Sequence, residues 1–261
     1  MRERLLRWAA IAAAAFVGAL IVVLTQAPAR WLSPLVARAS GDRLMLGDPD
    51  GTVWTGTADL VLSSGGATPL QTRLPGRFNW HLDAGQLLLG TGALRVENPA
   101  LLDAPLQVQV DRSLQATIES NRLRLPASAL TGLGAPWNTV KPGGELELQW
   151  DTLHVQAGTV HGALRGQWLR ASSGLSPIVP FGHYRLQADG YFDGARLRLD
   201  TVTGPLEMDG DGTISNGLQV HFHGLARVQP GTDPAVATQL SGLISLLGRS
   251  KGEEAILNFG T

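Results

Sequence analysis

Apolar and polar residues alternate along several segments of this chain, and this alternation limits what the chain can fold into. In residues 77–83, Phe78, Trp80 and Leu82 point one way and the polar residues between them point the other. Strict alternation over about four to eight residues is typical of antiparallel strands with one buried face. The sequence therefore predicts an antiparallel sheet that is apolar on one side and polar on the other. The same pattern recurs at 105–111, 145–151, 183–189 and 218–224.

Turn signals separate these segments. The chain has 32 glycines and 15 prolines, and only 16% of its residues are charged, which suits many short strands. No rhythm of alternating strands and helices is visible, so a parallel sheet is not expected. The pattern predicts an all-β fold of roughly ten to fifteen short strands, curved into an open groove or into a flattened barrel or sandwich. Turns are predicted at 48–51, 75–76, 142–144, 209–212 and 216–217.

One helix is expected near the C-terminus. Asp233 is a good N-cap, Pro234 suits the first helical position, and Gly248 can end the helix. A strand at 254–259 follows. We interpret the helix as a plug on one end of the sheet; the alternative is a helix that binds a partner. Its apolar stripe consists of Val236, Leu240, Leu243, Ile244 and Leu247.

Residues 8–24 form an uninterrupted apolar run that follows Arg2, Arg4 and Arg7. At about 1.5 Å per residue the run spans roughly 26 Å, close to a hydrocarbon core of about 30 Å. It is either a retained anchor or a signal peptide cleaved near 27–29, and its length favours the anchor. We predict a cytoplasmic segment 1–7, a transmembrane signal anchor 8–27 and a β-rich domain 28–261 beyond the membrane. Residues 30–39 suit a short interfacial helix or cap.

Residues 51–62, GTVWTGTADLVL, place Trp54 two residues before Gly56 on the apolar face of a predicted strand. A large indole beside a missing side chain can lean over bare backbone, and a glycine lets a sheet bend. Gly166 and Trp168 repeat the arrangement in reverse order. We interpret these tryptophans as structural devices that curve and seal the sheet; a ligand platform is the alternative.

The sequence shows no motif for catalysis. The 21 basic and 22 acidic residues leave a net charge of −1, which rules out a large basic field for nucleic acid, and cysteine is absent. His221 and His223 share a strand face but lack a third metal ligand, and the DGDG run at 209–212 suits a hairpin turn better than a calcium loop. We therefore expect no enzyme, catalytic residue, cofactor or metal. An open sheet would leave an apolar patch for a protein or lipid partner.

Five segments, taken in order, resemble the type II secretion system protein N family. They are PARWL at 28–32, GTVWTG at 51–56, LPGRFNWHL at 74–82, SPIVPFGHYRL at 176–186 and DTVTGPLEMDGDG at 200–212. Phe181 stands where the family pattern has Leu, a conservative change. The residues of these motifs are our candidate structural positions: Gly51, Trp54, Gly56, Trp80, Pro180, Gly182, Tyr184, Gly204, Pro205, Gly210 and Gly212.

The resemblance implies a single-pass protein of the bacterial inner membrane, with residues 28–261 in the periplasm. It implies a non-catalytic accessory component of the machine that exports folded proteins across the outer membrane. The implied partners are the inner-membrane platform proteins and the outer-membrane secretin. The family is also similar in style to AsmA-like proteins, which use curved β-grooves for lipid, and a lipid-binding or lipid-transfer protein at the inner membrane is the alternative.

Overall fold

A computed structural model describes residues 8, 15, 18, 25–66, 68–156, 159–191, 194–215, 219–247, 249–251 and 254–259. Most of the predicted anchor 8–27 lies outside the described residues, as do the predicted turn at 216–217 and Gly248. Within the described part of the chain, no helix has the length and apolar character needed to cross a membrane.

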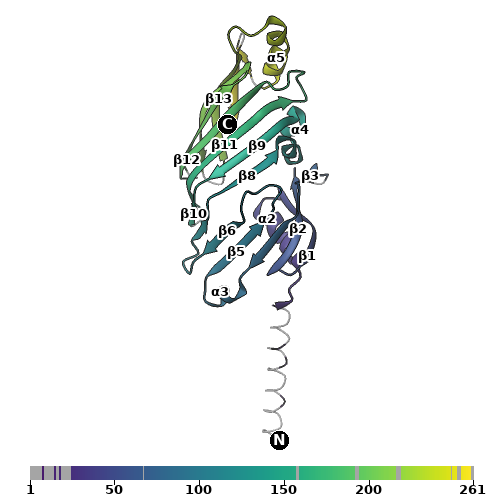
Figure 1. Ribbon diagram of the computed structural model, residues 1–261, viewed down its shortest axis with the longest axis vertical. Coiled ribbons are helices and arrows are strands. Elements are labelled where there is room, and N and C mark those ends of the chain that lie inside the picture. Colours follow the sequence, from purple (N-terminus) through teal and green to yellow (C-terminus); the bar gives the residue numbers. More distant parts are fainter. Residues whose placement is uncertain are drawn as a thin grey trace.

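The described residues form one 17-stranded sheet and a few short helices (Figure 1). The strands up to residue 126 are β1 (Leu44–Gly51), β2 (Thr55–Ser63), β3 (Gln71–Arg73), β4 (Phe78–Leu82), β5 (Gly92–Glu97), β6 (Leu106–Val110), β7 (Ala116–Ile118) and β8 (Asn121–Pro126). The later strands are β9 (Pro142–Trp150), β10 (Leu153–Gln156), β11 (Thr159–Ser173), β12 (Gly182–Tyr191), β13 (Ala195–Thr203), β14 (Leu206–Ser215), β15 (Gln219–Val228), β16 (Arg249–Lys251) and β17 (Glu254–Phe259). The helices are η1 (Ala29–Trp31), α2 (Leu32–Ala39), α3 (Ala84–Leu88), η2 (Ala127–Leu133), α4 (Trp137–Val140) and α5 (Pro234–Leu247).

The strand pairings are antiparallel and mostly join neighbours in the sequence. They run from β1 through β2, β4, β5, β6 and β7 to β10 and β11, and then through β12, β13, β14 and β15 to β17 and β16. β3 pairs with β2, next to β4, and β9 joins β11 beside β10 and carries β8. The sheet is not closed. The predicted all-β antiparallel fold is therefore confirmed, and of the shapes considered it takes the open groove.

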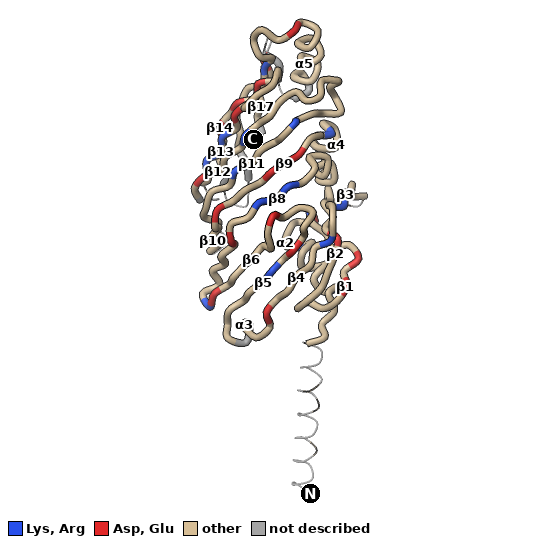
Figure 2. Tube along the Cα trace, viewed as in Figure 1, with Lys and Arg blue, Asp and Glu red and all other residues tan. Residues whose placement is uncertain are grey.

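The two faces of the sheet differ as the alternation predicts. Leu148, Leu164 and Leu186 lie on the inner face, around apolar cavities. Glu147 and Arg165, one position away on the same strands, lie on the outer face. Figure 2 shows basic and acidic residues interspersed along these strands. The period of two thus places the apolar side chains on one side.

Several predicted turns are wrong, because glycines here serve strand contacts. Residues 209–212 lie inside β14, where Gly210 pairs with Gly224 of β15. Residues 142–144 begin β9, and residues 48–51 belong to β1, which bulges between Gly47 and Asp50. The turn to β2 falls instead at 52–54. The bend at Pro75-Gly76, between β3 and β4, is confirmed.

Three clusters cover parts of the apolar face. In the N-terminal cluster, Ala29 of η1 and Leu32 of α2 pack against Ala58 and Trp80. The middle cluster is closed by the loop after β5 and by η2, and the C-terminal cluster is closed by α5. The middle cluster contains Leu62, Leu74, Leu101, Leu125 and Ala129, and the C-terminal cluster includes Phe181, Tyr184, Leu206, Leu240, Leu243 and Ile244.

The plug role of α5 is confirmed. The Asp233 carboxylate accepts the backbone N–H of Ala235 at 2.8 Å, so it caps the helix as predicted. Leu240, Leu243 and Ile244 are at most 4% exposed against the sheet. α5 lies at the end of the sheet opposite β1 and β5 (Figure 1). A helix is also present at 32–39, as predicted, with Trp31 half exposed at its start.

Candidate functional site: an apolar groove

An apolar groove lies on the inner face of the sheet between the middle and C-terminal clusters. Its volume is about 600 Å³, within the roughly 300–1,000 Å³ of small-molecule sites. Strands β11 to β15 and β17 form its floor and walls, α4 contributes Trp137 at one side, and α5 contributes Leu243 at the end. A cavity of about 240 Å³ shares Trp137 and Leu186 and extends the groove to Leu146 and Leu148 of β9.

The groove offers very little polar chemistry. None of the residues lining the 600 Å³ cavity has an ionisable side chain. Its one hydroxyl, Ser173 Oγ, donates a 2.5 Å hydrogen bond to the Val140 carbonyl, and the Trp168 indole N–H donates to the Gly143 carbonyl at 2.8 Å. The groove is therefore suited to holding an apolar group by shape.

Three aromatic rings support the groove at its α5 end. The Trp168 and Phe181 rings meet edge to face with centroids 5.7 Å apart, and Tyr184 lies 5.8 Å from Trp168. The Tyr184 hydroxyl is buried and donates to the Leu206 carbonyl at 2.8 Å. The packing of these rings stabilises the β11–β12 wall beside the groove.

Above pH 10 the free energy of unfolding is expected to fall as pH rises, because of Tyr184. Burial raises the pKa of this phenol in the folded chain above its ordinary value of 10.0, and the charge of Asp209 adds to the rise. The unfolded chain loses this proton near pH 10 while the folded chain keeps it, so stability falls by up to about 1.4 kcal/mol per pH unit. Urea unfolding between about pH 9 and 11 measures the slope. Tyr184→Phe should flatten it, and equal slopes for both proteins would contradict the assignment.

The candidate positions at 180–205 come together at the α5 end of the groove. A Cβ on Gly182 would overlap the Tyr184 ring, and a Cβ on Gly204 would overlap the Gly182 backbone. The Pro205 carbonyl accepts the N–H of Gln229 at 2.8 Å. Pro180, in the cis form, leads into β12. These residues therefore act in close backbone packing around Tyr184.

The candidate positions at 51–80 lie at the other end of the sheet, and the interpretation of Trp54 is wrong. Trp54 is in the turn before β2, whereas Gly56 pairs with Trp80 of β4. A Cβ on Gly56 would overlap the Trp80 ring, and the Trp80 indole N–H donates to the Val53 carbonyl at 3.2 Å. Gly51 pairs with Gly56 across the hairpin. An aromatic residue does cover Gly56, but it comes from the neighbouring strand.

Gly166 and Trp168 both line the groove, so they share the apolar face as predicted. The side chains nearest to Gly166, and to the glycines of β14, nonetheless come from neighbouring strands. Leu148 and Leu186, on the flanking strands, lie nearest to a Cβ on Gly166. A Cβ on Gly210 or Gly212 would meet the Phe222 ring of β15, 2.5 Å away at Gly210. The small residues thus allow Phe222 to lie across β14 and reach the groove.

Three groove residues that were missed from the sequence are Leu197, Leu199 and Trp137. Leu197 and Leu199 alternate with Arg196 and Arg198, a pattern that could have placed them on the inner face. Trp137 sits on a four-residue helix and has no periodic signal, so only the folded chain shows that it borders the groove.

Histidines do not build a metal site among the described residues. His154 and His161 face each other across β10 and β11, beside a polar cavity of about 440 Å³ that also contacts Asp111. The Asp111 carboxylate is already bonded to the Ser113 hydroxyl at 2.6 Å. The His223 ring lies 2.6 Å from the Asn258 side chain. In the part of the chain that the structure describes, no three His, Asp or Glu side chains could hold a metal together.

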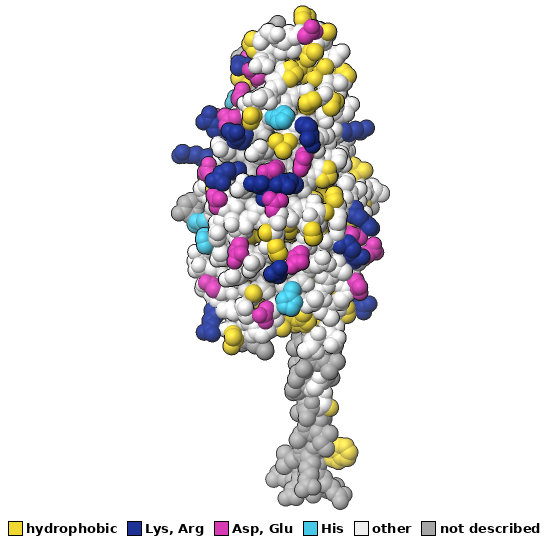
Figure 3. Space-filling view, in the orientation of Figure 1, with side chains coloured by type: hydrophobic (Ala, Val, Ile, Leu, Met, Phe, Trp, Pro, Cys, Tyr) yellow, Lys and Arg dark blue, Asp and Glu magenta, His cyan; other side chains and the backbone are white. Residues whose placement is uncertain are grey.

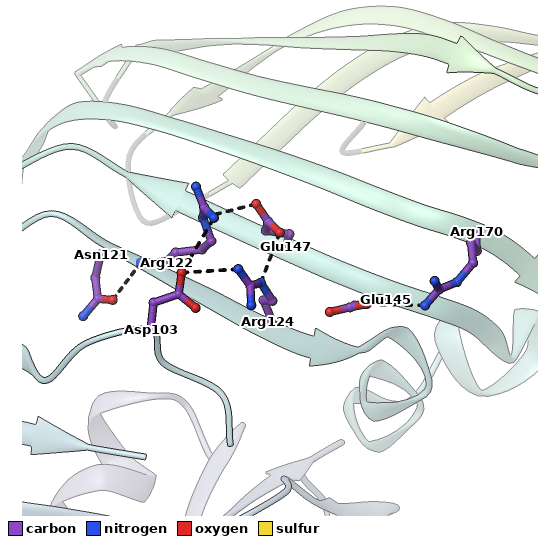
Figure 4. A network of polar contacts seen from close by, with 7 residues as sticks. All are labelled: Asp103, Asn121, Arg122, Arg124, Glu145, Glu147 and Arg170. Carbon is purple, nitrogen blue, oxygen red and sulfur yellow. Dashed lines mark hydrogen bonds and ion pairs between the residues drawn. The ribbon is translucent and has the colours of Figure 1, made fainter. Parts of the chain in front are cut away.

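The outer face carries paired charges (Figures 3 and 4). Glu147 lies 3.2 Å from Arg122 and 3.3 Å from Arg124, and Asp103 contacts the same two arginines at 3.7 and 3.4 Å. These contacts tie the loop after β5 to β8 and β9. Because opposite charges are paired, this part of the outer face presents no strong field of one sign.

The fold and the groove define a class of protein: an open antiparallel β-sheet with an apolar groove on its inner face. The chain belongs to the family of type II secretion system (T2SS) protein N, whose family model matches residues 42–256. The resemblance noted in the sequence is thus confirmed, and the protein is a component of the type II secretion system. Searches of curated proteins and of solved structures gave no match.

Proposed function

We propose that this chain is a non-catalytic, structural accessory component of type II secretion, helping folded proteins to leave the periplasm across the outer membrane. The observation that carries the proposal is a groove of about 600 Å³ without an ionisable lining residue, in a chain of this family. Such a surface supports binding and assembly, because acid–base or nucleophilic chemistry needs reactive groups that the groove lacks.

The same proposal places residues 8–27 in the inner membrane as a single-pass anchor and residues 28–261 in the periplasm. The uninterrupted apolar run at 8–24 supports the anchor. Family membership implies association with other type II secretion components, and we propose the inner-membrane platform proteins and the outer-membrane secretin as contacts. The sheet is elongated and α5 lies far from β1, which is compatible with contacts away from the membrane (Figure 1).

Deleting the gene for this chain is expected to trap secreted enzymes in the periplasm, because the export machine would lack one component. Enzyme activity is measured in the medium and in the periplasmic fraction, before and after the wild-type gene is restored. A control strain carries the outer-face variant Arg198→Gln, which should restore export fully. Unchanged export and unchanged assembly of the machine in the deletion strain would overturn the proposal.

A second candidate function is lipid binding at the inner membrane. The specific observation in its favour is that the groove walls carry half-buried leucines, Leu164, Leu186 and Leu199, between the covered clusters. An uncovered apolar surface of this kind marks an interaction site.

A further inference from the structure

The apolar groove is the stretch of the inner face left between two plugs. On one side, η2 and the loop after β5 fill the middle cluster, and on the other, α5 fills the C-terminal cluster. Between them, Leu164 packs with Ala188, Ala195 and Leu197 in a small cluster made only of strand residues. Covering this stretch would be favourable, because burying apolar surface contributes about 25 cal/mol per Å².

The chemistry of the walls decides what kind of occupant fits. The walls are sheet faces whose backbone N–H and C=O groups are paired in the strand ladder, and the Ser173 hydroxyl is already bonded to Val140. An extended peptide would bury its own backbone groups without partners, which is costly. A helix about 10 Å wide fills roughly 420 Å³ per turn, so a cavity of about 600 Å³ holds less than two turns. An acyl chain has no hydrogen-bonding groups that would be left without partners, and it is narrower than a helix.

A positive charge stands at the edge of the groove. Lys141 follows Val140, adopts a left-handed backbone conformation with φ of 47°, and is exposed. Its side-chain carbons lie beside Gly174, next to Ser173, so it adjoins two segments that line the groove. Among the ion pairs of the described residues, none includes Lys141.

We propose that the groove binds the acyl portion of a phospholipid from the bilayer, with Lys141 at the rim contacting the phosphate of its headgroup. The inference rests on the second candidate function and names its ligand. An ammonium group beside an apolar slot matches a molecule with an anionic head and an apolar tail.

The test uses the full chain in growing cells fed radioactive phosphate. A photoreactive phenylalanine analogue replaces Leu199 or Leu186 on the inner face, and Arg198 or Gln187, the adjacent outer-face positions, in matched controls. After illumination, the purified chain should carry radioactive lipid at positions 199 and 186 and background label at 198 and 187. The two inner positions guard against a local folding defect at one of them.

Three further variants test the binding mode with the photoreactive group at 199. Lys141→Gln should lower the radioactive yield about threefold to tenfold, while Lys141→Arg should retain it. Leu186→Trp should reduce the yield by filling the groove. Crosslinking to a protein at 199 and 186, or no phosphate label at either, would overturn the inference. Neither result touches the secretion role, which the deletion strain tests separately.

Discussion

Gly204→Ala is expected to lower the free energy of unfolding by about 2–6 kcal/mol. Gly204 has a φ of 129°, a region that non-glycine residues rarely adopt, and forcing a side chain there costs about 1–3 kcal/mol. A Cβ would also overlap the Gly182 backbone and lie 2.6 Å from the Phe181 carbonyl oxygen, adding about 1–3 kcal/mol of overpacking. Urea unfolding of the purified full chain, followed by circular dichroism, measures the loss.

Gly231→Ala is the matched control for this variant. Gly231 also has a positive φ, 85°, but no atom lies within 4 Å of a Cβ placed there. Gly231→Ala should lower the free energy of unfolding only by the conformational cost of about 1–3 kcal/mol. The difference between the two variants therefore isolates the contact of residue 204 with β12. Equal losses would show that the close packing of Gly204 on Gly182 contributes nothing.

Trp80→Ala is expected to cost about 3–5 kcal/mol, the range for removing a buried aromatic side chain. Trp80 is 9% exposed, packs in the N-terminal cluster, and covers the bare backbone of Gly56. The variant removes this packing and the indole hydrogen bond to the Val53 carbonyl. Thermal unfolding of the full chain should show a melting temperature lower by about 6–20 °C.

Trp137→Ala is the comparison for Trp80→Ala. Trp137 is 37% exposed at the rim of the groove and belongs to none of the buried clusters described above. Its loss should cost about 1 kcal/mol or less. If Trp80→Ala were as mild as Trp137→Ala, the cross-strand cover over Gly56 would not be a source of stability.

Local pattern was enough to predict much of the fold. The alternation at 77–83 and 145–151 placed Trp80, Leu146 and Leu148 on the inner face, where the structure has them. The signals at Asp233 and Pro234 located the start of α5. Both patterns are carried by a few consecutive residues, so they can be recognised without knowing what packs against them.

Most of the wrong predictions from the sequence concerned glycines. The run at 209–212 has the composition of a hairpin turn, yet it lies within β14 because Phe222 of β15 needs bare backbone to cross. Likewise Trp54 is the aromatic residue nearest to Gly56 in sequence, but Trp80 is the one that pairs with it. A glycine in a strand and a glycine in a turn look alike until the cross-strand partner is known.

The sequence alone was enough to predict the strands of this chain, the two unlike faces of its sheet, the plugging helix and the family to which it belongs. These features could be predicted because period, capping and motif order are local properties of the sequence. Tertiary packing settled which aromatic covers which glycine, that the sheet stays open, and that an apolar cavity of about 600 Å³ remains between η2 and α5. Those features depend on pairings between segments distant in sequence, such as Gly204 beside Gly182, and on how far each plug extends over the sheet.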